Sequence, residues 1–222
     1  MSSVFIVSKV TNYSLKTIIF KTIASLFFVA LAAYLFTLTQ GHVLFKTFAL
    51  LGLIFGLLGD VFLGFKYITT KTKPFWILAG MYAFAFGHIS YVIALFTEFY
   101  IRGQVVFAAM PFVTALVLCT IYMFVSRRVG INFGPKMLPF GLFYLFCLTS
   151  MLSTSFYMAL LHNFTNITSV MFFCGAICFA TSDFMLTGAY FKAGQRPKPY
   201  LAIYSVAYYV AQFVIAFSFF FL

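Results

Sequence analysis

Seven long apolar runs, separated by short segments that hold most of the basic residues, make up nearly all of this chain. An α-helix needs about 20 predominantly apolar residues to cross the hydrocarbon core of a bilayer. The runs therefore predict membrane-spanning helices over about 17–38, 44–65, 74–97, 105–125, 137–161, 167–190 and 200–222. Residues 1–222 are expected to form a single all-α, polytopic membrane domain.

The composition excludes most other classes of protein. Hydrophobic residues are 64% of the chain and charged residues only 8%, against about a quarter charged in a soluble domain. A soluble fold of 222 residues could not bury that much apolar surface. The net charge of +11 does not predict a nucleic-acid partner, because the basic residues stand between the apolar runs, where they set membrane topology.

The basic residues are distributed unequally between the two sides of the predicted bundle. One side has Lys9, Lys16, Lys66, Lys71, Lys73, Arg127, Arg128, Lys136, Lys192, Arg196 and Lys198, and the other has only Lys46 and Arg102. Since basic loops stay in the cytoplasm, the N-terminus is predicted to be cytoplasmic and the C-terminus on the opposite side. A bacterial inner membrane or a eukaryotic endomembrane fits this pattern.

The first span also has an alternative interpretation. Lys16, an apolar stretch and Ala30-Leu31-Ala32 resemble a signal peptide with its cleavage site. The apolar run continues through Leu38, however, which is longer than a signal core. We therefore expect an uncleaved helix.

Two of the three acids in the chain, Asp60 and Asp183, lie inside predicted spans, and so do Lys21 and His88. A carboxylate at the bilayer centre costs about 2.5–3.5 kcal/mol on insertion scales, so such residues usually face a cavity or a partner. The two aspartates are therefore candidates for a functional site. The alternative is a buried ion pair or a hydrogen-bonded clamp between helices, and Lys21 is also close enough to a helix end to snorkel.

The segments around the two aspartates look alike. Gly59-Asp60-Val61-Phe62-Leu63-Gly64 compares with Ser182-Asp183-Phe184-Met185-Leu186-Thr187-Gly188. His88 follows Asp60 by about as many residues as Gln212 follows Asp183. These similarities suggest a parallel pseudo-repeat in which three spans, one linking span and three further spans place the aspartates in equivalent positions.

Four short motifs, in order and at matching intervals, resemble those of a known family. They are Leu58-Gly59-Asp60-Val61-Phe62-Leu63, the series Gly80, Phe84, His88 and Tyr91, the series Gly175, Ala176, Phe179, Ser182 and Asp183, and Tyr208-Tyr209-Val210-Ala211-Gln212. The chain resembles the YhhN/TMEM86 family of integral-membrane lysoplasmalogenases. Members of this family are often drawn with eight helices, which leaves room for one span beyond the seven.

The resemblance implies hydrolysis of the vinyl-ether bond of a lysophospholipid, the lysoplasmalogen, to a fatty aldehyde and glycerophosphoethanolamine or glycerophosphocholine. Asp60 and Asp183 would form the catalytic acid–base pair, in either order, with His88 orienting water or sharing the proton transfer. Lys21, Tyr91, Tyr208 and Gln212 would bind substrate. Besides this lipid and the bilayer, no partner, cofactor or metal is implied.

Two other functions fit the same intramembrane residues. Asp60 and Asp183 could serve as proton or cation sites in a small secondary transporter. Together with His88 they could also supply three metal ligands, although one histidine and two carboxylates make a sparse set. The chain has neither a Gly-x-Ser-x-Gly elbow nor a His-Glu-x-x-His pair, so serine-hydrolase and zincin mechanisms have no support.

Overall fold

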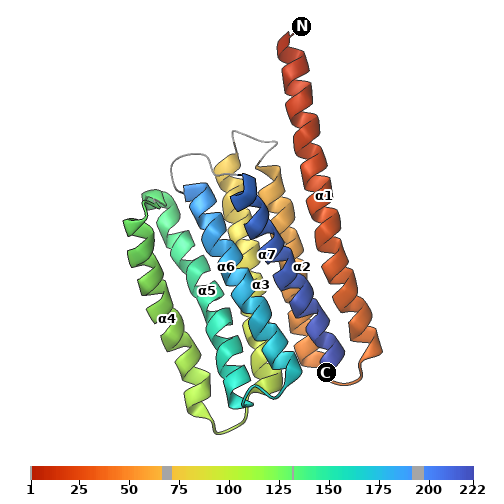
Figure 1. Cartoon of the computed structure of the whole chain (residues 1–222), viewed down its shortest axis with the longest axis vertical. Helices are drawn as coiled ribbons and strands as arrows, with labels where there is room; N and C mark the ends of the chain where they lie inside the picture. Colours follow the sequence, from red (N-terminus) through yellow and green to blue (C-terminus); the bar gives the residue numbers. More distant parts are fainter. Residues whose placement is uncertain (1, 67–71, 132, 192–197) are drawn as a thin grey trace.

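The computed structural model describes residues 2–66, 72–131, 133–191 and 198–222, and Figure 1 shows these as a bundle of roughly parallel helices. Its helices are α1 (Ser2–Leu38), α2 (Val43–Phe65), α3 (Lys73–Phe99), α4 (Val105–Arg128), α5 (Gly134–Leu161), α6 (Ile167–Phe191) and α7 (Lys198–Phe217). A short 3₁₀-helix, η1 (Ser218–Phe221), continues α7. All seven α-helices are long and apolar enough to cross a membrane, which confirms the expected seven-span, all-α architecture.

The helix ends differ from the predicted ones by a few residues for physical reasons. Pro74 and Pro135 stand in the first turns of α3 and α5, where a missing N–H costs nothing. Arg127 and Arg128 extend α4 by completing its last turn, because cations are favoured at a helix C-terminus. The largest difference is α1, which begins at Ser2 rather than near residue 17 and projects beyond the bundle in Figure 1.

Six helices form a closed ring, and the seventh lies outside it. Going round the ring, the contacts run from α1 to α2, α3, α5, α6, α7 and back to α1, while α4 packs mainly on α5. A parallel 3+1+3 repeat would give this arrangement, since α1–α2–α3 corresponds to α5–α6–α7 and α4 is the link. In this order α2, with Asp60, and α6, with Asp183, occupy equivalent places.

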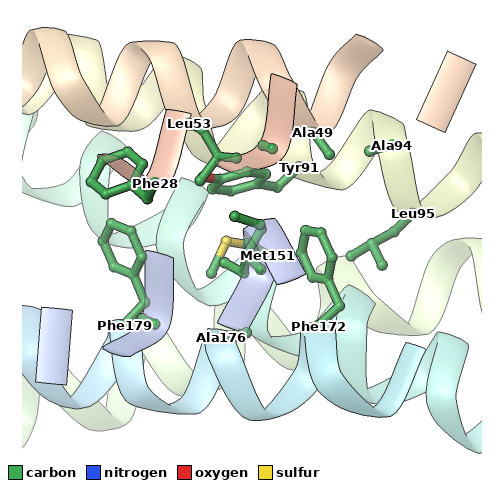
Figure 2. Close-up of a cluster of buried hydrophobic side chains, with 14 of the residues drawn as sticks. Phe28, Ala49, Leu53, Tyr91, Ala94, Leu95, Met151, Phe172, Ala176 and Phe179 are labelled. Carbon is green, nitrogen blue, oxygen red and sulfur yellow. The ribbon is translucent and has the colours of Figure 1, made fainter. Parts of the chain in front are cut away.

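Small residues allow the closest helix pair, α2 and α3, to approach. A Cβ atom added to Gly52 would lie 2.3 Å from Cε1 of Tyr91, and one added to Gly87 would lie 3.1 Å from the Gly52 carbonyl oxygen. Figure 2 shows the Tyr91 ring in the middle of the buried cluster, near Leu53. The same cluster contains Met151 and, from α6, Phe172 and Phe179, so this core fixes the positions of the helices around the aspartates.

Most basic residues of the described loops and helix ends lie at the end of the bundle where α2, α4 and α6 finish, whereas Arg102 lies at the other end. We call the first of these the basic end; Lys66, Arg127, Arg128 and Lys136 lie there, while Lys71, Lys192 and Arg196 lie outside the described residues. At the opposite end Lys46 is buried, and its Nζ donates a hydrogen bond to the Thr39 carbonyl oxygen at 2.6 Å. Lys46 therefore caps the C-terminus of α1.

Candidate functional site

Asp60 and Asp183 line the same small cavity, in the half of the bundle nearer the basic end. Asp60 comes from α2 and Asp183 from α6, and their side chains are only 3% and 5% exposed. The cavity has a volume of about 30 Å³, and a water molecule needs roughly 10–15 Å³ by this kind of measure. The cavity can therefore hold one or two water molecules beside the two carboxyl groups that line it.

Asp60 is paired with a cation and a hydroxyl group, both from α1. Lys21 Nζ lies 3.6 Å from one carboxylate oxygen, Oδ1. The Ser25 hydroxyl donates a hydrogen bond to the other, Oδ2, at 2.5 Å. Lys21 and Ser25 are four residues apart and so lie on the same face of α1. These contacts compensate the charge of a buried carboxylate, which would otherwise be costly.

Asp183 has a neutral partner instead. The Tyr144 hydroxyl, from α5, donates a hydrogen bond to its Oδ2 atom. Within the described part of the chain, no Lys, Arg or His forms an ion pair with Asp183. Burying a carboxyl group without a cation costs much less when the group carries a proton. The Asp183 site therefore suits a neutral carboxylic acid, and its Oδ1 atom is left for the proton.

Each aspartate accepts a hydrogen bond from a hydroxyl group, but only one of the two also has a charged partner among the described residues. In each half, the aspartate of the middle helix is bound by a side chain of the first helix, Ser25 in one half and Tyr144 in the other. Only the first half adds a lysine, Lys21. Two equivalent positions thus have different electrostatic environments, and separate acid and base roles require such a difference.

His88 does not line the cavity; Tyr144 lies between the imidazole and Asp183. Its Nε2 atom is 3.4 Å from the Tyr144 hydroxyl oxygen, and its Nδ1 atom is 3.3 Å from the Met151 sulfur. The imidazole is fully buried and packs edge-on against the Phe179 ring. The structure therefore places His88 in contact with the partner of Asp183 rather than with the cavity itself.

The four residues expected to bind substrate divide into two groups. Lys21 and Tyr208 line the cavity. Gln212 and Tyr91 stand behind Tyr208: the Gln212 amide nitrogen donates to the Tyr208 hydroxyl at 3.1 Å, and the Tyr91 hydroxyl donates to the Gln212 amide oxygen at 2.9 Å. This buried chain links α3 to α7 and orients Tyr208 beside Asp60.

A second cavity, which is almost entirely apolar, adjoins the first. It lies among α2, α3, α4, α5 and α6 and has a volume of about 50 Å³. Asp183 lines both cavities, and so do Leu63, Phe84, Leu186 and Tyr190. We call the first the polar cavity and the second the apolar slot. Of the described residues that line both spaces, Asp183 is the only one with a carboxyl group.

The sequence did not identify several residues that shape the site. Ser25 had a weak signal, because it lies one helical turn from the intramembrane Lys21. Tyr144 had none, since it stands in a run rich in aromatic residues. Tyr190 lines both cavities and accepts a hydrogen bond from Lys66 Nζ, a pairing between helix ends that only the fold reveals.

The aspartates and His88 do not form a metal-binding cluster. Within residues 2–66, 72–131, 133–191 and 198–222, no group of three or more His, Cys, Asp or Glu side chains is placed to hold a metal ion. Tyr144 stands between His88 and Asp183. The Lys21 ammonium group already lies beside the Asp60 carboxylate, where a metal ion would have to bind.

The sequence pattern of one protein family, described as the YhhN family, matches residues 16–219 of the chain. The match includes at least part of each of the seven helices and every residue placed above in the candidate site. No curated protein and no solved structure matches the chain.

Proposed function

Because the chain belongs to the YhhN family, we propose that it is a membrane-embedded hydrolase that cleaves the vinyl-ether bond of lysoplasmalogens. The products are a fatty aldehyde and glycerophosphoethanolamine or glycerophosphocholine. One observation carries the proposal: two buried carboxyl groups line one cavity, and only one of them is paired with a cation. This difference in charge supplies the acid and the base that the reaction needs.

Asp183 is the general acid in this mechanism. A vinyl ether reacts by protonation of the carbon that is one bond removed from the oxygen-bearing carbon. The Asp183 carboxyl group donates this proton, the carbon–carbon double bond supplies the electron pair, and an oxocarbenium ion results. The hydrogen bond from Tyr144 stabilises the carboxylate left on Asp183.

Asp60 is the general base. Its carboxylate, held ionised by Lys21, stabilises the oxocarbenium ion and takes a proton from the water that attacks it. The product of this step is a hemiacetal. Asp60 then protonates the departing glycerol oxygen while the Asp183 carboxylate accepts the hemiacetal hydroxyl proton. The aldehyde forms, and both aspartates return to their starting states.

The remaining polar residues act through these two. Lys21 and Ser25 hold Asp60, Tyr144 holds Asp183, and His88 positions Tyr144. Tyr208 presents its hydroxyl group beside Asp60 at the polar cavity. Both carboxyl groups are buried, so a small number of water molecules beside them are the ones that react.

Conservative substitution of each aspartate tests the mechanism. Asn keeps the size of Asp but neither delivers a carboxylic proton nor accepts one, so Asp60→Asn and Asp183→Asn should each lower aldehyde release by about 10²–10⁴-fold. The double variant should be little worse than either single one, because groups that act as a unit are non-additive. The assay is aldehyde release from a defined lysoplasmalogen by purified protein in detergent, with Asn163→Asp in a loop outside the site as a matched control.

The substrate itself provides a second arm of the same test. Ester lysophospholipids and saturated alkyl ethers should bind without turnover, since they have no enol-ether double bond to protonate. A folded Asp60→Asn or Asp183→Asn protein with normal turnover would show that the aspartate only clamps helices. Proton-coupled solute uptake into liposomes without any aldehyde release would show a transporter instead.

A further inference from the structure

The apolar slot has no part in the acid–base chemistry, yet it ends at the general acid. Besides Asp183, most of its lining consists of Leu, Ile, Met and Phe side chains, including Ile77 and Met81 of α3 and Leu142 and Leu145 of α5. Such a lining offers hydrocarbon contact and few hydrogen bonds. A phosphate or glycerol group placed there would lose its hydration without replacement.

The polar cavity shares Leu63, Phe84 and Leu186 with the slot but has more polar side chains in its lining. Tyr204, Ser205, Tyr208 and Tyr209 of α7 line it together with Lys21. A lysoplasmalogen has the same division, because its vinyl-ether bond joins an aliphatic chain to a hydroxyl-bearing glycerophosphate. The bond to be cleaved lies where the two halves of the lipid meet, and Asp183 is the carboxyl group that lines both cavities.

Gly141 of α5 lines the apolar slot and is unlike the other helical glycines of the described chain. At Gly52, Gly59, Gly64 and Gly175 an added Cβ atom would lie less than 3.0 Å from a packed side chain. At Gly141 the nearest atom would be a ring carbon of Phe133 at 3.4 Å, an ordinary contact. Glycine inside a helix costs about 0.5–1 kcal/mol relative to alanine, so helix packing gives no reason for Gly141.

We propose that the apolar slot binds the aliphatic chain of the lysolipid, and that Gly141 keeps it wide enough for that chain. The assignment rests on the hydrolase function proposed above and deepens it, since it orients the substrate across Asp183. In this orientation the aliphatic chain of the lipid lies among α3, α5 and α6, and its glycerophosphate head lies on the α7 side. Gly141 is then a residue that determines chain specificity.

The first experiment narrows the slot from Gly141. Gly141→Leu should lower kcat/KM for a lysoplasmalogen with an 18-carbon chain by about tenfold or more, the effect of misfitting one or two methylene groups in an apolar pocket. The loss should be much smaller for an 8-carbon chain. Gly141→Ala should stay near the parent protein, because its Cβ atom fits. Ala109→Leu, at an exposed position of α4, is the matched control for added bulk. Equal losses on both chains, or none on either, would overturn the assignment.

The second experiment uses the unaltered protein and does not depend on turnover. A saturated alkyl-ether lysophospholipid with a photoreactive diazirine near the end of its chain is irradiated with the unaltered protein in detergent, and labelled peptides are identified by mass spectrometry. Labels are expected on α3 and α5, around residues 77–81 and 138–145. Labels confined to α1 or α7, or no labelling, would overturn the chain assignment. If labelling is as expected and no lysoplasmalogen yields aldehyde, the slot binds such lipids and the proposed hydrolysis is what fails.

Discussion

Lys21→Met removes the cation beside Asp60 and nearly preserves the length of the side chain, so it tests the charge difference directly. At the observed separation of 3.6 Å, two unit charges at an effective dielectric constant near 20 attract by about 4–5 kcal/mol. Lys21 is 32% exposed, and screening at such a position reduces the figure to about 2–3 kcal/mol. If the Asp60 carboxylate depends on this cation, kcat/KM for aldehyde release should fall by about 30- to 150-fold.

Two further variants separate catalysis from folding. Lys21→Arg keeps the positive charge and should retain most of the activity. The double variant Lys21→Met/Asp60→Asn removes both buried charges and should unfold thermally at or above the temperature of Lys21→Met alone, while remaining inactive. Normal turnover by Lys21→Met, at an unchanged unfolding temperature, would refute the reasoning, because Asp60 would then need no cation to act as the base.

Two further predictions rest on particular contacts and one on the distribution of basic residues. Tyr144→Phe removes the hydrogen bond to Asp183 and should lower aldehyde release by about tenfold, whereas His88→Ala should cost less; a greater loss from the histidine variant would place the imidazole in the chemistry. Gly52→Ala puts a Cβ atom 2.3 Å from a Tyr91 ring carbon and should destabilise the protein by about 1–3 kcal/mol in thermal unfolding; an unchanged unfolding temperature would argue against the tight α2–α3 packing. A cysteine at Thr72 should react with an impermeant thiol reagent only from the cytoplasmic side, and labelling from outside intact cells would reverse the orientation.

The proposed mechanism depends on the different surroundings of two carboxyl groups that lie in the middle helices of α1–α2–α3 and α5–α6–α7. Asp60 and Asp183 occupy equivalent helices of the ring, and each is held by the first helix of its own half. A symmetric site would give both carboxyl groups the same charge preference. Lys21 has no counterpart at Asp183 among the described residues, so the two carboxyl groups of one cavity are suited to opposite roles.

The sequence alone determined the class of fold and indicated which residues are candidates for a functional site. Twenty-residue apolar runs have few stable arrangements in a bilayer, because every backbone polar group must be bonded within its own helix. Ionisable residues are so costly in that setting that Asp60, Asp183, Lys21 and His88 could be named as candidates before the packing of the helices was known. The motif spacing then identified the family, which the match over residues 16–219 confirmed.

Only the tertiary structure decided which of these residues meet. Hydropathy gives the length of a helix but not its rotation or its neighbours, which depend on side-chain packing such as that between Gly52 and Tyr91. The ion pair of Lys21 with Asp60, the hydrogen bond of Tyr144 with Asp183, and the contact of His88 with Tyr144 each join two different helices, so they depend on how those helices are rotated against each other. The apolar slot is likewise a space left among five helices, and no single segment of sequence encodes it.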